Sequence, residues 1–518
     1  MASEPLRELP PLRGSALLIG TAAMSLAVFM NVLDTSIANV SIPYIAGDLG
    51  VSPDQGTWVI TSFGVANAIS LPLTGWLTRR VGQVRLFTWS TFLFVAASFL
   101  CALAPSLGLL IAFRVLQGAV AGPMIPLSQA LLLSSYPKSK AGAALGIWSM
   151  TSLVAPVVGP LLGGWITDNI SWPWIFYINV PVGLIAGAAT WAIYRKRETA
   201  TARVPVDRIG LALLVVWVGA LQIMLDKGKD LDWFGSTQIV TLAILAVVCF
   251  VVFIIWELSD ENPIVDLALF RKRNFWVSTL AMLLAYGVFF GNVVLLPLWL
   301  QEYMGYTATL AGLVLAPVGL LAVFLTPIVG RTIDRIDPRL YVTASFAVFA
   351  LVFFMRSAFD TQAPLATLLV PTVIQGAAMA CFFVPLLALG LSGIAPERIP
   401  SASSLMNFAR IISGSFGTSI VTTLWDRRAT LHHSQLIERL ARGAPLPAQA
   451  LAQMHRNGLT AGQSFGVLNR MVDAQAFMLS ADDIFYVSGM LFVALVAIIW
   501  LARPAPGGAA AQVGTAAH

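Results

Sequence analysis

Long stretches of apolar residues, separated by short polar segments, follow one another along nearly the whole chain. Fourteen of them have about the length of a membrane-spanning helix, because a bilayer core about 30 Å thick takes about 20 residues of α-helix to cross. Their approximate limits are residues 15–42, 57–78, 86–104, 107–135, 141–167, 173–194, 208–225, 237–256, 275–301, 308–330, 340–358, 364–393, 403–425 and 484–502. The pattern predicts an all-α membrane protein with fourteen spans.

Composition supports this class. The chain is 58% hydrophobic and only 11% charged, with a mean hydropathy of +0.81. Ordinary soluble domains carry roughly 25% charged residues. A water-soluble globular protein is therefore excluded.

The Lys and Arg residues predict the orientation, because they concentrate in cytoplasmic loops. An even number of spans places both termini on one side. If that side is the cytoplasm, its segments hold Arg79, Arg80, Arg85, Lys138, Lys140, Arg195, Lys196, Arg197, Arg203, Arg208, Arg271, Lys272, Arg273, Arg331, Arg335 and Arg339. The opposite loops hold Lys227, Lys229 and Arg356, and the long segment 426–483 holds others. Both termini are thus predicted to be cytoplasmic, and the pI of about 9.4 requires no nucleic-acid partner.

Three sequence matches at nearly one offset indicate an internal repeat. Gly75 and Gly330 open similar loops 255 residues apart, Gln117 and Gln375 lie in similar stretches 258 residues apart, and Gly50 and Gly305 are again 255 apart. We therefore expect two six-helix bundles, with an inserted helix pair between them and a polar segment near the end. The predicted divisions are 1–14 (cytoplasmic N-terminus), 15–200 (first bundle), 201–270 (inserted pair), 271–503 (second bundle, with the extracytoplasmic loop 426–483) and 504–518 (disordered tail).

One carboxylate, Asp34, lies well inside the first apolar stretch. An ionised Asp at the bilayer centre costs about 2.5–3.5 kcal/mol on insertion scales, and intramembrane acids are functional by default. Asn31, Asp34, Thr35 and Ala38 share one helix face, which would suit a water-filled cavity. Two roles stay open for Asp34: a proton-binding site, or a structural acid paired with Arg114 of the fourth stretch.

Two arginines, Arg114 and Arg410, lie well inside apolar stretches. Arg114 cannot release its proton, so it could orient a nearby acid but not carry the proton itself. Arg410 suits either a substrate or inter-bundle contact, or a structural hydrogen-bonding role.

The stretch 141–167 contains Pro156 followed by "GPLLGG". A proline bends a helix, and Gly159 and Gly163 form a small-xxx-small face for close helix approach. These features suit a hinge or seal in alternating access, and ordinary tight packing is the alternative.

Six sequence motifs together resemble those of the fourteen-helix drug:proton antiporter family of the major facilitator superfamily. The resemblance rests on "LDTSIANVSIP", "GWLTRRVGQVRLF", "RVLQGAVAGPMIP", "APVVGPLLGGW", "WPWIFYINVPVG" and "LMNFARIISGSFGTS", and it covers nearly all of the chain. The loop motif departs from the family pattern, because Arg79 stands where an acid is usual. The resemblance implies two bundles plus two inserted helices, a bacterial inner-membrane location and the export of hydrophobic drug-like compounds.

The resemblance also assigns roles to residues. It implies proton coupling by Asp34 and Arg114. It further implies a conformational motif made by Gly75, Arg79, Arg80, Gly82, Pro156, Gly159, Pro160, Gly163 and Gly164.

Substrate contacts are expected from aromatic, Met and amide side chains of the central helices, which can form a broad apolar pocket with few polar anchors. The candidates are Asn31, Tyr286, Phe290, Asn292, Gln375, Met379, Phe382, Asn407 and Arg410. Each has packing or lipid contact as its alternative. No cofactor is expected. His432 and His433 are adjacent in a polar loop without further ligands, so no metal site is expected either.

The segment 426–483 is too long for a simple connection, and Leu431, Ile437 and Leu440 have helical spacing. It is expected to face outward and to receive a partner. The resemblance implies a periplasmic adaptor of the EmrA type that leads to an outer-membrane channel of the TolC type. A loop folded back over the transporter mouth is the alternative.

These features predict proton-driven efflux by alternating access. A proton-coupled uptake carrier of the same fold and a non-transporting membrane receptor or scaffold remain as alternatives. The sequence has no phosphate-binding loop, metal cluster or nucleophile elbow, so we do not expect an enzyme.

Overall fold

The computed structural model describes residues 10–504 except 138–139, 203–204, 206, 261–262, 307, 334 and 442–444. The side chains of some further helical residues, Pro156 and Pro160 among them, also lie outside the description, as does the predicted tail from residue 505. All regular secondary structure in the described part is helical, as predicted.

The first ten helices make up the N-terminal part of the fold. They are α1 (Gly14–Asp48), α2 (Pro53–Gly56), α3 (Trp58–Ser70), α4 (Thr74–Val81), α5 (Gln83–Ala102), α6 (Leu107–Ala121), α7 (Met124–Ser135), α8 (Ala141–Asn169), α9 (Trp174–Tyr177) and α10 (Asn179–Tyr194). The remaining helices are α11 (Arg208–Lys227), α12 (Thr237–Ser259), α13 (Arg273–Glu302), α14 (Ala308–Thr332), α15 (Pro338–Arg356), α16 (Leu365–Ala380), α17 (Phe383–Leu391), α18 (Ile399–Ala441), α19 (Pro445–Arg456) and α20 (Ala461–Ile499).

The number of spans agrees with the sequence pattern. Within the described residues, 11 helical segments are long and apolar enough to cross a membrane, and the pair α3–α4, bent by 61°, is a twelfth. Two further helices, α8 with 29 residues and α18 with 43, are also long enough to cross a membrane, which is consistent with the fourteen spans predicted. The chain is therefore a multi-pass membrane protein.

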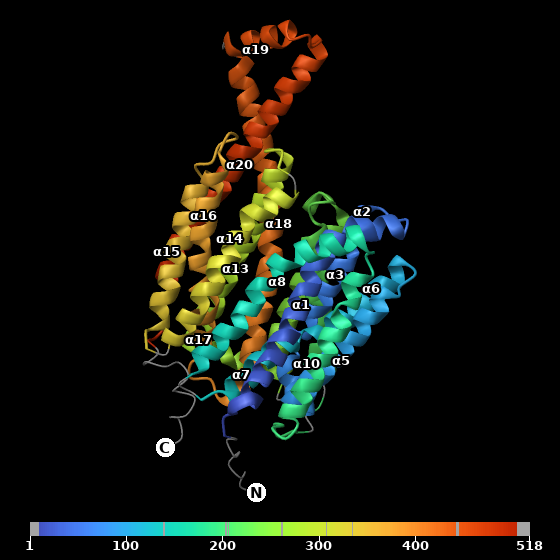
Figure 1. The fold of residues 1–518 in the computed structure, drawn as a ribbon, viewed down its shortest axis with the longest axis vertical. Helices are drawn as coiled ribbons and strands as arrows, with labels where there is room; N and C mark the ends of the chain where they lie inside the picture. The colour runs from blue at the N-terminus through green and yellow to red at the C-terminus, as the bar shows by residue number, and fades with distance from the viewer. Residues whose placement is uncertain are drawn as a thin grey trace.

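The helices pack in two groups that stand side by side (Figure 1). In the first group α1 packs on α8 and α10, and α6 packs on α3 and α5. In the second group α18 packs on α13 and α20, while α14 and α15 pack on α16. We call these the N-terminal and C-terminal groups. Contacts of α8 with α14 and of α7 with α18 join them.

The start of α1 and the end of α20 lie at the same end of the bundle, which we call the termini side (Figure 1). At the opposite end α18 and α20 continue outward as a hairpin with α19 at its tip, and we call this end the hairpin side. Residues 426–483, predicted as a long loop with helical spacing, are thus mostly helical.

The base of the hairpin is fixed by aromatic packing. Trp425 of α18 donates its indole hydrogen to the Phe477 carbonyl at 2.9 Å, and the Phe477 ring stacks on Tyr303 with ring centroids 4.4 Å apart. The Ser480 hydroxyl returns a hydrogen bond of 2.7 Å to the Trp425 carbonyl. These contacts hold α18 and α20 together where they leave the bundle.

The inserted helices α11 and α12 touch both groups at the hairpin side. Lys227 donates to the Thr57 hydroxyl of the N-terminal group at 3.1 Å. Lys229 forms an ion pair of 2.9 Å with Asp426 of α18, and Trp233 donates to the Thr423 hydroxyl at 2.9 Å. The pair is therefore a link between the groups.

Candidate functional site

Asp34 is the centre of a buried polar network in the N-terminal group. Its side chain is only 1% exposed, and that of Arg114 is fully buried. Arg114 Nη1 lies 2.5 Å from Asp34 Oδ2. The other carboxylate oxygen, Oδ1, accepts hydrogen bonds from Gln117 Nε2 at 3.1 Å and from Asn179 Nδ2 at 2.7 Å. The acid of α1 therefore binds both α6 and α10.

Further contacts extend the network to α3 and α5. Arg114 donates through Nε to the Val59 carbonyl at 2.9 Å, and its guanidinium lies 4.3 Å from the Phe63 ring centroid. Asn179 also donates to Ser98 Oγ at 3.0 Å. Five spans of one group thus converge on this ion pair.

The geometry restricts where a proton can go. Among the described residues, the hydrogen bonds to the Asp34 carboxylate come from N–H donors of Arg114, Gln117 and Asn179. A proton that binds to either carboxylate oxygen would therefore have to displace one of these donors. The network is also sealed from solvent in this conformation. Exchange of a proton therefore requires the helices around Asp34 to separate.

Gln117 and Asn179 were not among the residues predicted from the sequence. Gln117 lies one helical turn after Arg114, and it was recognised only as part of the internal repeat. Asn179 follows a break between α9 and α10, and a single amide in an apolar stretch carries no distinguishing signal.

The two groups meet through polar and aromatic contacts toward the termini side. Gln129 of α7 accepts hydrogen bonds from Ser403 and, at 3.3 Å, from Asn407 of α18. The Trp148 ring of α8 stacks on Phe383 of α17 with centroids 5.7 Å apart. Together these residues form a closed contact, which we call the termini-side seal.

The loop motif lies beside this seal. A Cβ at Gly75 would collide with Ser401 of α18, so only glycine permits this approach of α4 to the C-terminal group. Gly82 has φ of +95°, which favours glycine at the junction of α4 and α5. Arg79 donates to the Pro263 carbonyl at 3.4 Å, and the Arg80 guanidinium lies 5.3 Å from the Trp76 ring.

The glycines of α8 face α1. A Cβ at Gly159 would lie 2.5 Å from Ser36 Cβ, and one at Gly163 would lie 3.2 Å from the Ile37 carbonyl oxygen. Gly164 has more room, with its nearest neighbour, Val40 Cγ1, at 4.0 Å. α8 is one continuous helix over this region.

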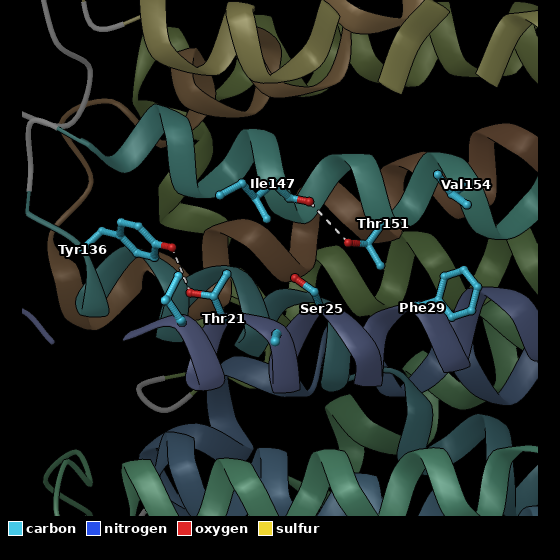
Figure 2. A pocket seen from close by; sticks show the side chains of 9 residues that line it. Thr21, Ser25, Phe29, Tyr136, Ile147, Thr151 and Val154 are labelled. Atoms are coloured by element: carbon cyan, nitrogen blue, oxygen red, sulfur yellow. Dashed lines mark hydrogen bonds between the residues drawn. The ribbon is translucent and has the colours of Figure 1, made fainter. Parts of the chain in front are cut away.

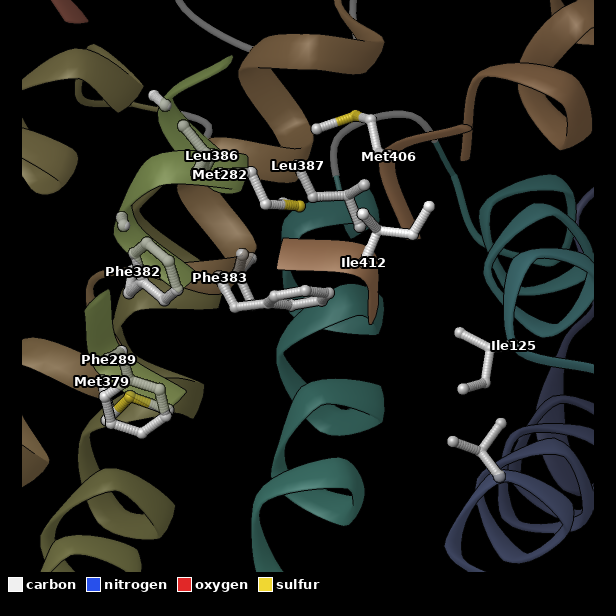
Figure 3. Packing of buried hydrophobic residues seen from close by; sticks show 14 of the residues in the cluster. Ile125, Met282, Phe289, Met379, Phe382, Phe383, Leu386, Leu387, Met406 and Ile412 are labelled. Atoms are coloured by element: carbon white, nitrogen blue, oxygen red, sulfur yellow. The ribbon is translucent and has the colours of Figure 1, made fainter. Parts of the chain in front are cut away.

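Four of the predicted substrate residues form one aromatic cluster in the C-terminal group. Tyr286 stacks on Phe290 at 4.9 Å and on Phe382 at 6.3 Å, and the Arg410 guanidinium lies 5.4 Å from the Tyr286 ring. Figure 3 shows Phe289, Met379 and Phe382 among the buried hydrophobic residues that pack together. The structure thus brings these side chains together.

The predicted amide residues have protein partners instead. Asn31 donates to the Ala121 carbonyl at 3.3 Å, and Asn407 belongs to the termini-side seal. Asn292 donates to Ser488 Oγ at 2.9 Å, while Gln375 accepts from Arg356 at 2.6 Å. These bonds favour packing roles for Asn292 and Gln375 in this conformation.

A cavity of about 460 Å³ lies between α1 and α8 (Figure 2). Its lining residues are Leu18, Thr21, Ala22, Ser25, Phe29, Tyr136, Ile147, Thr151 and Val154. None of the substrate residues predicted from the sequence lines it.

Arg356 is a buried cation that the sequence placed in a loop. It ends α15 and is 2% exposed, with Nη2 bonded to Gln375 Oε1 at 2.6 Å and to Thr372 Oγ1 at 3.3 Å. Arg356 was predicted to lie in a loop because it stands at the very end of an apolar stretch. Hydropathy locates the end of a span, but it does not show which side chains at that end point into the protein.

The comparisons with known proteins identify related transporters. Residues 24–418 match the family model described as Major Facilitator Superfamily. The chain is 52% identical to the multidrug export protein EmrB of Haemophilus influenzae, over 96% of this chain and 98% of that protein. It is 50% identical to the fatty acid resistance protein FarB of Neisseria gonorrhoeae, with 96% and 98% covered.

Solved structures agree with the fold. The proton:xylose symporter XylE, bound to 6-bromo-6-deoxy-D-glucose, matches with a TM-score of 0.60 at 14% identity, over 96% of this chain and 98% of that chain. This likeness concerns the arrangement of the helices alone.

The ion pair predicts non-additive effects on stability. Arg114→Gln leaves a buried carboxylate without its cation, and breaking a buried pair from one side costs about 3–5 kcal/mol. Asp34→Asn should cost a similar amount, whereas the double variant removes both charges and should recover most of the loss. Thermal unfolding of the three purified variants in detergent measures this, and strictly additive losses would show that the two residues do not interact.

Proposed function

The chain belongs to the major facilitator superfamily, and on that premise we propose that it is a proton-driven exporter of hydrophobic, drug-like compounds. It is a transporter and not an enzyme, as its family and its relatives show. The names of the two relatives, a multidrug export protein and a fatty acid resistance protein, fit substrates with large apolar parts.

The observation that carries the proposal is the buried network around Asp34. A carboxylate deep in a membrane protein is retained for a task, because it is expensive to insert. Asp34 holds α6 and α10 to α1 through Arg114, Gln117 and Asn179. Protonation of Asp34 removes the charge that attracts all three donors.

This loss of attraction provides the coupling. The neutral acid binds Arg114 weakly, so the helices around it can shift, and a shifted arrangement can expose the site to the other side of the membrane. Release of the proton restores the pair and the sealed arrangement. Proton movement and alternating access are then two aspects of one change, since a ligand shifts an equilibrium only through its different affinity for the two states.

The contacts between the groups support alternation. The termini-side seal consists of a few hydrogen bonds, one stacked ring pair and the close approach at Gly75. Such a contact can open without unfolding either group. We propose that residues 15–200 and 271–503 move as two units and that 201–270 is the inserted link.

The distribution of basic residues supports the orientation. Loops on the termini side carry most of the Lys and Arg that flank the spans, so we place both termini in the cytoplasm of a bacterium and the hairpin in the periplasm.

The hairpin suits a protein partner. Phe465 is 61% exposed and Met471 is 59% exposed, and Leu431 and Ile437 are also exposed. Large apolar side chains on a projecting surface mark interaction sites. We propose that they dock a periplasmic adaptor of the EmrA type, which would continue to an outer-membrane channel of the TolC type.

Proton coupling predicts the behaviour of Asp34→Asn. Inside-out vesicles with an acidified lumen should accumulate a drug through the wild-type protein, because protons leave the lumen as the drug enters. Asp34→Asn should abolish this accumulation, and the stability-restoring double variant with Arg114→Gln should remain inactive. Drug loss from the lumen under the same gradient would instead indicate an uptake carrier, and pH-dependent efflux by Asp34→Asn would exclude Asp34 as the proton site.

The contact of α8 with α1 predicts a contrast between two glycines. Gly159→Ala places a Cβ against Ser36, and overpacking of this kind costs about 1–3 kcal/mol, so it should slow transport while drug binding to the purified protein persists. Gly164→Ala meets only Val40 Cγ1 at 4.0 Å and should transport normally. Equal transport rates in the two variants would contradict a role for this contact in the cycle.

The hairpin predicts a separation of transport from resistance. Replacing residues 436–470 by a short flexible linker keeps the Trp425–Phe477 base, so transport in vesicles should persist. Resistance in cells should be lost, because no adaptor can dock.

Two point variants make this test specific to the apolar surface. Phe465→Glu should lower resistance, whereas Gln453→Glu adds the same charge at an exposed polar position and should not. Loss of vesicle transport by the shortened protein would place the hairpin in the transport cycle, and full resistance in cells would place the docking elsewhere.

A further inference from the structure

Arg410 lies on the face of α18 that points toward the N-terminal group. Ser403, Asn407 and Arg410 are spaced by four and three residues, so they share one side of the helix. The first two contact Gln129 in the termini-side seal. Arg410 follows one helical turn farther along α18, so it lies next to the termini-side seal, on the side of the seal that faces the hairpin.

Aromatic rings surround the guanidinium. It lies 5.4 Å from the Tyr286 ring centroid and 5.1 Å from that of Phe383. Figure 3 shows Phe383 extending from α17 toward α8, where it stacks on Trp148. Arg410 thus belongs to the aromatic surface that spans the contact between the two groups.

The charge of Arg410 has no carboxylate partner among the residues that the structure describes. Arg114 has Asp34, and Arg356 is hydrogen-bonded by Gln375 and Thr372. Among the described residues, the guanidinium of Arg410 contacts the rings of Tyr286 and Phe383, and the residue is only partly buried. An arginine is permanently charged, so this position holds a cation without a carboxylate partner at the contact between the two groups.

We propose that Arg410 is a specificity-determining residue that binds the anionic carboxylate of amphiphilic substrates. The guanidinium fork matches a carboxylate in a bidentate geometry. The apolar part of the substrate would lie along Tyr286, Phe290, Phe382 and Met379, which form the adjacent cluster. This inference rests on the proposed export function and names one class of its substrates.

The position of the site indicates that its ligand is a transported substrate and not a permanently bound structural ligand. Opening of the seal would break the bonds of Ser403 and Asn407 to Gln129, and Arg410 lies on the same face of α18. A carboxylate held there would change its exposure from one side of the membrane to the other as the seal opens and closes.

The test compares two probes that differ only in the headgroup. Decanoate carries a carboxylate that is ionised at neutral pH, and 1-decanol is its uncharged counterpart. Binding to the purified full chain is measured by tryptophan fluorescence in an uncharged detergent, so that no anionic lipid competes. A hydrogen bond to a charged group is worth about 1.5–3 kcal/mol, so the wild type should prefer decanoate by on the order of ten- to one-hundredfold.

Variants at the site separate recognition from packing. Arg410→Gln should remove the preference for decanoate, measured as the ratio of the decanoate affinity to the decanol affinity, and Arg410→Lys should retain part of the preference as a point charge. Arg427→Gln changes an exposed arginine farther along α18 and should alter neither affinity. An equal loss for both probes, or a lowered melting temperature with no change in the ratio, would assign Arg410 to packing and overturn the proposal.

A transport measurement distinguishes this proposal from the function on which it rests. Compared with wild-type vesicles, Arg410→Gln vesicles should lose more of their decanoate accumulation than of their accumulation of a neutral drug. If wild-type vesicles accumulate neither compound, the export function fails. If decanoate enters equally fast with and without Arg410 while the neutral drug is exported, only the carboxylate site fails. If decanoate binding appears only after anionic phospholipid has been removed from the protein, Arg410 is a lipid headgroup site and the proposal is overturned.

Discussion

The ion pair between Asp34 and Arg114 is the constraint on which the N-terminal group depends. Two charges withdrawn from water lose several kcal/mol of solvation each, and their attraction compensates only when the remaining hydrogen-bonding positions are also filled. Here Gln117, Asn179 and the Val59 carbonyl fill most of them, and Arg114 Nη2 has no hydrogen-bond partner among the described residues. The pair therefore determines how α1, α3, α6 and α10 are placed, and a change in its charge acts on all of these helices at once.

The C-terminal group has a similar buried polar network, but this network has no acid at the position that corresponds to Asp34. Asn292 lies 258 residues after Asp34 and donates to Ser488, much as Asp34 accepts from Asn179. Thr372 lies 258 residues after Arg114, and the guanidinium next to it comes from Arg356, which lies 255 residues after Cys101. The repeat thus keeps a buried arginine next to Gln375 but supplies it from a different helix. The position that repeats Asp34 is occupied by Asn292, so the proton site that we propose has no counterpart at the matching place in the C-terminal group.

The sequence was sufficient for the spans, the repeat and the central acid, since each depends on a strong and local signal. Apolar length predicts helices, and one carboxylate in an apolar stretch is conspicuous. The structure was needed where side chains of ordinary composition become important through position. Gln117 and Asn179 are amides like many others, Arg356 stands at a span limit that hydropathy cannot resolve, and α18 and α20 extend as continuous helices through a segment whose polarity suggested a loop. The predicted amides Asn292 and Gln375 satisfy neighbouring helices, which spacing alone could not show.

The inserted pair adds a condition that any alternating motion must satisfy. Lys227 contacts the N-terminal group, and Lys229 and Trp233 contact α18 of the other group, all at the hairpin side. In the turn that follows Lys229, Asp232 and Trp233 both have positive φ, of 56° and 47°. This backbone conformation costs about 1–3 kcal/mol and persists only where surrounding contacts fix it. A link so constrained does not stretch easily, so separation of the groups on this side has to break contacts of Lys229 and Trp233 with α18 or carry the inserted helices along with it. In either case the energy that opens the hairpin side must come from another step of the cycle, and the protonation that we propose for Asp34 would act on several spans together.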